Sequence, residues 1–362
     1  MREKIKKLKR DQIRVKERMN LSVLKKMAFT ATLLALLVVL LGAFTRLSHA
    51  GLGCPDWPGC YGFAHIPTSS NDIVQANQAF PDQPYELAKA WPEMVHRYFA
   101  TSLGLLVLIL AILSFRHRNR PAFKYLLGLL LLVAFQGALG RWTVTLKLHP
   151  GIVMSHLAGG LTTLSLLAAL TFRFYTEFKV LISSSEFKQF KGLIYFSLVV
   201  LVTQILLGGW TSANYAATVC VDLPICQGDW FVNSDFESGF IFWGHDVETY
   251  QYGILDSAGR IAIHASHRMG AIITAIVLCF LSYQLIFSSK SHLLKRFGYI
   301  ISFLVLVQVS LGIINIIYQL PLYNAVAHNG VGALLLLVLS LLLTSFIQSD
   351  PRKLVAMEND ND

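Results

Sequence analysis

Eight long apolar runs constrain the fold of this chain more than any other feature of its sequence. Each has about the 20 residues that a helix needs to cross the hydrocarbon core of a bilayer. A spanning segment must satisfy its own backbone hydrogen bonds, so each run is predicted to be a helix. The chain is therefore expected to be an all-α integral membrane protein with eight transmembrane helices. The runs are 28–48, 95–115, 123–145, 152–172, 192–213, 265–287, 297–318 and 324–347.

The composition excludes an ordinary soluble protein. Of the 362 residues, 54% are hydrophobic and only 14% are charged. A soluble chain of this length needs far more charge to cover its surface. The two long loops, about 49–92 and 214–263, leave no room for a soluble domain of usual size.

The basic residues predict the orientation. With the N-terminus in the cytoplasm, the cytoplasmic segments hold 24 of the 31 Lys and Arg residues, eleven of them between Met1 and Met27. This positive-inside pattern predicts that both termini are cytoplasmic and that both long loops lie on the outer side. The net charge of +10 then reflects topology and contact with anionic lipid, and no nucleic-acid partner is expected.

The two halves of the chain repeat each other. The pattern C-x-D-x-P-x-C occurs at 54–60 and again at 220–226, and further matches follow at offsets of 171 and 172 residues. Such a constant offset indicates an internal duplication. Two four-helix bundles related by a pseudo-two-fold axis along the membrane normal are expected. The predicted parts are a basic tail (1–27), an N-terminal half (28–178), a linker (179–191), a C-terminal half (192–347) and a cytoplasmic tail (348–362).

Histidines recur on every even-numbered run. His96 and His156 belong to the first half, and His267 and His328 are their counterparts in the second. A lone histidine in a span is often only a hydrogen-bond partner, but two imidazoles facing each other across a bundle suit a six-coordinate heme iron. Zinc or copper would need three or four clustered ligands. The pattern therefore favours one bis-histidine heme site in each half.

Residues beside the histidines fit the same hypothesis, although each also has a structural interpretation. Arg97 and Arg268 directly follow ligand candidates and could bind heme propionates, or could instead reach toward the membrane surface. Nearby glycines would let a flat macrocycle approach the backbone, but they also serve ordinary helix packing. These glycines are Gly159, Gly160, Gly330 and Gly332.

The duplication breaks at position 93. Glu93 lies three residues before His96 on the same predicted helix face, whereas its repeat partner is His264. A carboxylate at the mouth of a span could assist chemistry, or could simply pair with Arg97 or Lys89. The carboxylate makes the N-terminal half the better candidate for catalysis, and the C-terminal half would then hold a resident heme.

Four of the five cysteines fall on the predicted outer side. Local disulfides Cys54–Cys60 and Cys220–Cys226 are the simplest interpretation in an oxidising compartment. A zinc site and redox exchange with an external thiol carrier remain open. Cys279 lies inside the sixth run and is expected to pack.

These motifs together resemble bacterial heme A synthases with cysteine pairs in their outer loops. The resemblance runs from about Thr30 to Ser345. Its most specific parts are Thr45–Ser48 continuing into Gly51–Pro58, then Glu93–Arg97, and Ser266–Gly270.

The resemblance implies an oxidoreductase of the cell inner membrane that oxidises the C8 methyl of heme O to a formyl group, giving heme A for cytochrome oxidase. It implies that His96 and His156 flank substrate heme O, that Glu93 is the catalytic carboxylate, and that His267 and His328 ligate heme b. Water or dioxygen would supply the oxygen, and an external acceptor or quinone would take the electrons. The implied partners are heme O synthase and oxidase assembly factors, with a homo-oligomer also open.

Two other functions would share some of these features. A diheme cytochrome b for electron transfer shares the bis-histidine bundles but does not predict Glu93 opposite His264, or paired cysteines in the outer loops. A transporter with a parallel repeat would place its polar site at the membrane midplane, whereas the polar residues of this chain crowd the outer ends of the runs.

Overall fold

The structure is a computed structural model that describes residues 2–116, 120–176, 182, 184–244 and 247–346. The predicted tail 348–362 lies outside the described residues, as does most of 177–183 around the start of the predicted linker. Within the described ranges the chain is helical, with two short loop helices and no strand longer than an isolated bridge between Cys60 and Phe63.

Eight helices in the described part of the chain are long and apolar enough to cross a membrane, which confirms the predicted all-α membrane class. The short helices α2 (Ser70–Ala79) and α7 (Phe236–Gly239) belong to the two long loops. The eight long helices are α1 (Arg2–Leu47), α3 (Leu87–Arg116), α4 (Arg120–Thr145), α5 (Pro150–Thr176), α6 (Ser184–Ala213), α8 (Ser257–Phe287), α9 (His292–Ile317) and α10 (Leu322–Phe346).

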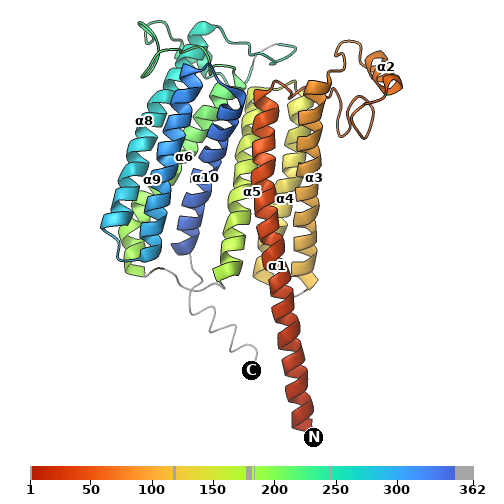
Figure 1. Cartoon of the computed structure of the whole chain (residues 1–362), viewed down its shortest axis with the longest axis vertical. Helices are drawn as coiled ribbons and strands as arrows, with labels where there is room; N and C mark the ends of the chain where they lie inside the picture. The colour runs from red at the N-terminus through yellow and green to blue at the C-terminus, as the bar shows by residue number, and fades with distance from the viewer. Residues whose placement is uncertain (1, 117–119, 177–181, 183, 245–246, 347–362) are drawn as a thin grey trace.

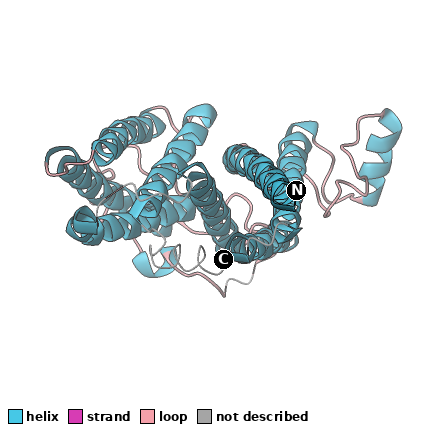
Figure 2. Ribbon diagram, turned by 90° about the horizontal axis from the view of Figure 1, so that it is seen from below, coloured by secondary structure: helices cyan, strands magenta, loops and turns pink. Residues whose placement is uncertain are grey.

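The long helices form two groups of four that stand side by side (Figures 1 and 2). In the first group α1 contacts α3 and α5, and α4 completes the ring between them. In the second group α6 contacts α8 and α10, and α9 completes the ring. The groups meet where α1 and α5 pack on α10 and where α5 packs on α6. The pseudo-two-fold axis between them stays a prediction.

Both long loops lie at the same end of the helices, opposite the N-terminus (Figure 1). We call this end the long-loop face. Of the helices that begin at the long-loop face, α3 and α8 start well before the apolar runs that predicted them, at Leu87 and Ser257. The Asp256 side chain caps α8 by accepting a hydrogen bond from the Gly259 N–H (2.9 Å), so polar residues extend this helix beyond the apolar stretch. His96 and His267 therefore lie deeper in their helices than the sequence indicates.

The four helices that end at the long-loop face close in the same way. In each, an N–H just beyond the helix donates to the carbonyl five residues earlier, the bond of a Schellman-type C-terminus. The donors are Ala50, Leu148, Ala216 and Leu320, which donate to Thr45, Thr143, Thr211 and Asn315. Next to each bond a residue has a positive φ, namely His49, Lys147, Tyr215 and Gln319 in that order. These matched ends agree with the duplication found in the sequence.

One expectation changes in the structure, and another stays a prediction. The cytoplasmic tail at 1–27 stays a prediction, and the structure adds that α1 runs without a break from Arg2 to Leu47. Cys279 does not pack in the interior but is exposed on the surface of α8. In a span, that surface faces lipid, which accommodates a small apolar thiol as readily as a protein core does.

Candidate functional site

The two histidines of the N-terminal half face each other. His96 on α3 and His156 on α5 have ring centroids 6.4 Å apart and ring planes at 82°. The Nδ1 atom of each ring is buried without a hydrogen-bond partner. A buried polar atom normally has a partner, so these two atoms mark a place where a ligand is expected.

The separation of these rings suits a metal ion between them. A metal–imidazole bond is about 2 Å long and the ring centroid lies about 1 Å behind the nitrogen, so shared ligation needs centroids about 6 Å apart. In the part of the chain that the structure describes, no three His, Cys, Asp or Glu side chains converge on one point. Two imidazoles and a macrocycle supplying four nitrogens fit this donor set.

The histidines of the C-terminal half differ in their partners. His267 on α8 has its Nδ1 3.0 Å from the Gln204 side-chain amide of α6, and His328 on α10 has its Nε2 3.3 Å from that of Gln308 on α9. An amide nitrogen only donates, so in both contacts the ring nitrogen is the acceptor and the ring is held in place by the glutamine. The residue of the first half that corresponds to Gln204, 166 positions earlier, is Val38. Sequence reasoning missed this difference between the halves.

Glycines on neighbouring helices make room for all four rings. A Cβ added at Gly42 would lie 3.0 Å from Cε1 of His96, and one at Gly208 would lie 2.9 Å from Cε1 of His267. At Gly140 and Gly312 the corresponding distances to His156 and His328 are 3.5 and 3.2 Å. These four glycines contact the histidines more directly than the glycines chosen from the sequence. Their regular offsets of 166 and 172 residues were the signal that could have found them.

Substitution of Gly42 by alanine is expected to lower the heme-oxidising activity implied by the resemblance about tenfold. The His96 ring would have to move by a few tenths of an ångström, and small misplacements at a reacting centre are costly. The loss cannot come from a weaker helix, since alanine favours helix more than glycine does. Activity per folded protein in detergent measures it. Gly137→Ala, where nothing lies within 4 Å, is the matched control, and equal activity in the two variants would contradict the contact.

Each cysteine pair closes a ring of seven residues around an arginine. The structure joins Cys54 to Cys60 and Cys220 to Cys226 as disulfides. Arg97 Nη1 donates to the Asp56 carbonyl (3.0 Å) and to that of Gly59. Arg268 Nη1 donates to the matching carbonyls of Asp222 and Ile225, the latter at 2.7 Å. The C-x-D-x-P-x-C motif thus builds an arginine-binding loop in each half.

Both arginines therefore have partners other than the propionates expected from the sequence. Arg268 is buried and also donates to the Cys220 carbonyl and, through Nε, to Nε2 of His264 (3.3 Å). Arg97 forms an ion pair with Glu93 (2.5 Å). Contact of either arginine with a propionate stays a prediction. The disulfide loops already accept hydrogen bonds from most of the N–H groups of each guanidinium.

Glu93 lies at the junction of the first loop and the histidine site. It is buried on α3, and its second carboxylate oxygen accepts the Cys54 N–H at 2.9 Å. Among the described residues no hydrogen bond joins Glu93 to His96. His264 occupies the matching place in the second half and likewise pairs with the arginine four residues later. The predicted pairing of Glu93 with Arg97 is present, whereas Lys89 pairs with Glu86 (2.9 Å).

The first long loop packs into a small core of its own. Cys54, Cys60, Tyr61 and Ile66 are buried against Met94 of α3. The Tyr61 hydroxyl donates to the Pro84 carbonyl (3.1 Å), and burial, followed by the nearby carboxylates, raises the pKa of Tyr61 to about 12. The disulfide loop is thereby held against the helix that carries Glu93 and His96.

The second long loop reaches across to the N-terminal half. The Trp243 ring stacks on His149 at the start of α5, with centroids 4.4 Å apart. The Tyr250 N–H donates to the Lys147 carbonyl at 3.0 Å. One loop of the C-terminal half thus covers part of the long-loop face of the N-terminal half.

Comparisons with known proteins agree with this architecture. The COX15-CtaA family, described as cytochrome oxidase assembly protein, matches residues 25–340. A heme A synthase from Shewanella oneidensis is 48% identical over 304 residues, which cover 84% of this chain and 91% of that protein. The heme A synthases of Orientia tsutsugamushi (strain Boryong) and Mesorhizobium japonicum are 25% and 26% identical, and each alignment covers 88% of this chain and 94% and 88% of the relative. The chain therefore belongs to the COX15-CtaA family of cytochrome oxidase assembly proteins, among which its curated relatives are heme A synthases.

Proposed function

We propose that this chain is a heme A synthase, an oxidoreductase that converts the C8 methyl of heme O to a formyl group. The conversion removes four electrons and four protons and adds one oxygen atom, which water can supply. The observation that carries the proposal is the facing pair His96 and His156, 6.4 Å apart beside a buried carboxylate, in a chain 48% identical to a heme A synthase.

The two halves have different tasks in this proposal. His96 and His156 hold substrate heme O, and His267 and His328 hold heme b, which supplies one-electron redox chemistry when bound. The contact of Gln204 with Nδ1 of His267 supports the resident role of the second site, because the amide holds that ring in place. The first site lacks the counterpart of Gln204, as suits a ligand that must be exchanged at every turnover.

Glu93 is proposed to act on the substrate electrostatically. Arg97 and the Cys54 N–H hold its carboxylate in one orientation, one helical turn before His96. A fixed negative charge there stabilises positive charge that develops on the reacting methyl carbon. The disulfide loop, through Cys54, is a positioning element for this carboxylate.

The charges of the chain and its family suggest its membrane orientation and its partners. The long-loop face is proposed to lie on the outer side of the inner membrane, with both termini in the cytoplasm. Heme O synthase would deliver the substrate, oxidase assembly factors would receive the product, and an external acceptor or quinone would take the electrons.

Co-expression with a heme O source tests the function directly. Hemes extracted from the membranes are separated by chromatography, and heme A should appear only when this chain is present. A His96→Ala variant made in parallel should leave heme O unconverted. A diheme cytochrome b of electron transfer would bind heme and yield no heme A, and that result would reject the proposal.

A further inference from the structure

Two hydrogen-bond donors without partners lie at the long-loop face, in the interface between the two groups of four helices. We call this interface the seam. The two donors are Nε of Arg46, at the end of α1, and the hydroxyl of Tyr215, just after α6; both atoms are buried. The Arg46 guanidinium lies over the Tyr215 ring, 4.1 Å from its centroid, so both donors belong to one small patch. Buried donors of this kind are costly unless something accepts from them.

The rest of the Arg46 side chain is well anchored. Its Nη2 donates to the Ser212 carbonyl (2.6 Å) and the Ala213 carbonyl (3.3 Å) at the C-terminal end of α6. A cation is favoured there because the carbonyls of the last helical turn carry partial negative charge. The guanidinium is therefore held in place, with Nε left over.

Arg46 stands above the N-terminal histidine site. It follows Gly42 by four residues, so both lie on one face of α1, and Gly42 is the residue against which the His96 ring packs. The helix α1 contacts both α3 and α5, which carry His96 and His156. Arg46 lies about 6 Å beyond Gly42 along α1, in the direction of the long-loop face.

Arg46 is the charged group of this patch. The His49 ring lies nearly parallel to that of Tyr215 (6°), with centroids 5.7 Å apart. Burial lowers the pKa of His49, and the positive charges of Arg46 and Lys89 lower it further. Glu86 pairs with Lys89 and Glu93 with Arg97, and among the described residues no ion pair includes Arg46.

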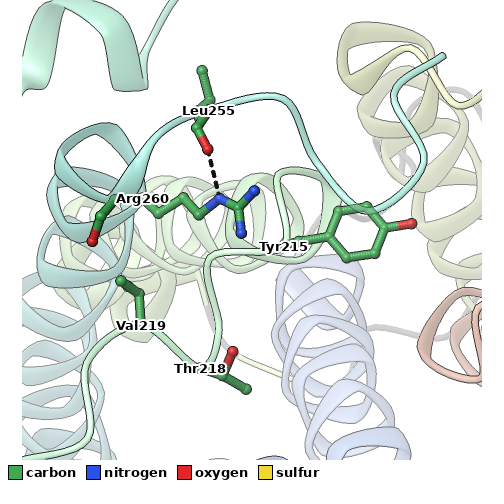
Figure 3. Close-up of a pocket in the computed structure, with 6 residues that line it drawn as sticks. Tyr215, Thr218, Val219, Leu255 and Arg260 are labelled. Atoms are coloured by element: carbon green, nitrogen blue, oxygen red, sulfur yellow. Dashed lines mark hydrogen bonds between the residues drawn. The ribbon is translucent and has the colours of Figure 1, made fainter.

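Tyr215 also borders an open pocket on the C-terminal half, but its hydroxyl is not directed there. Figure 3 shows the ring extending away from Arg260, with the hydroxyl at its far end. Arg260 already donates from Nε to the Leu255 carbonyl (2.9 Å). The Tyr215 hydroxyl is therefore directed away from Arg260, the basic residue that lines the pocket.

We propose that Arg46 and Tyr215 form a carboxylate-binding subsite for a propionate of the porphyrin held by His96 and His156. The proposal rests on the proposed function, because it needs a porphyrin in the N-terminal half. It gives the seam a role in binding, since one residue of the subsite comes from each half. Arg97, in contrast, is engaged by its disulfide loop.

Porphyrin titration tests the subsite without relying on turnover. The full chain is purified from cells unable to make heme and titrated with iron mesoporphyrin as the diacid or as its dimethyl ester, with the Soret band as readout. Arg46→Gln should weaken binding of the diacid about 10- to 100-fold in one of the two sites, as expected for a charge-assisted hydrogen bond. Binding of the diester should change little.

Tyr215→Phe provides an independent test that keeps the ring and its contacts with Arg46 and His49. It should weaken diacid binding about tenfold and leave diester binding unchanged. Arg46→Lys should recover only part of the diacid affinity, because it retains the charge but not Nε. Lys147→Gln, an exposed cation on the same face, is the matched control and should have no effect.

Equal weakening of diacid and diester would overturn the subsite, and so would unchanged diacid binding in Tyr215→Phe. The second outcome would also follow if the patch held a lipid phosphate or a free anion instead of a propionate. Failure of the wild-type chain to bind either porphyrin would reject the proposed function itself, so the two failures are distinguishable.

Discussion

Replacing His96 with alanine is expected to lower heme A formation by more than about 100-fold. Removing a residue that only supports a metal ligand costs up to about 100-fold, so removing the ligand itself should cost more. The substrate iron would lose one of its two protein ligands, while His156 stays 6.4 Å from the vacated ring position. His156→Ala should have the same effect. Heme extraction measures heme A against heme O in membranes containing equal amounts of each variant.

The reciprocal substitutions separate the two sites. His267→Ala and His328→Ala should reduce the bound heme b, whereas His96→Ala should leave it in place. His65→Ala serves as the control, because His65 is exposed in the first long loop and contacts Phe63 rather than the helix bundle. Normal heme A formation by His96→Ala would contradict the assignment of the substrate site.

Replacing Glu93 with glutamine is expected to lower turnover about 100- to 1,000-fold while heme content stays unchanged, because the loss of one preorganised electrostatic contact has this size. Glutamine retains an oxygen that can accept the Cys54 N–H, so the disulfide loop should remain in position. The effect should fall on kcat rather than on KM. The control is Glu86→Gln, because Glu86 is exposed and pairs with Lys89 rather than with Arg97.

A comparison with Arg97→Gln distinguishes catalysis from anchoring. If Glu93 only ties the first loop to α3, removing either partner of the ion pair should lower activity and thermal stability together. A carboxylate that acts on substrate predicts a different outcome. Glu93→Gln should then reduce kcat with little change in thermal stability, whereas Arg97→Gln should chiefly destabilise, by about 3–5 kcal/mol, because it leaves a buried charge unpaired.

The sequence predicted the elements that depend on local pattern. Apolar runs of spanning length identified all eight helices, since the bilayer sets their length and hydropathy. The internal repeat singled out the four histidines, because two copies of a motif at one offset are far more informative than one. The facing of His96 and His156 was expected on this basis, and their ring separation agrees with it.

What the sequence did not predict depends on contacts between segments. Nothing local indicates that Gly42 packs against His96, because the two residues lie on different helices. The positions of Arg97 and Arg268 directly after ligand candidates do not indicate that their long side chains reach the carbonyls of the disulfide loops. The early start of α8 depends on the cap by Asp256, which a hydropathy pattern does not register.

The most direct measurement is the electron paramagnetic resonance spectrum of the oxidised, purified protein loaded with heme O. Iron held between two imidazoles should give low-spin signals from both halves. His96→Ala and His156→Ala should each remove the same one of these signals, and His267→Ala the other. A spectrum in which neither His96→Ala nor His156→Ala alters any signal would show that these two side chains do not bind the iron.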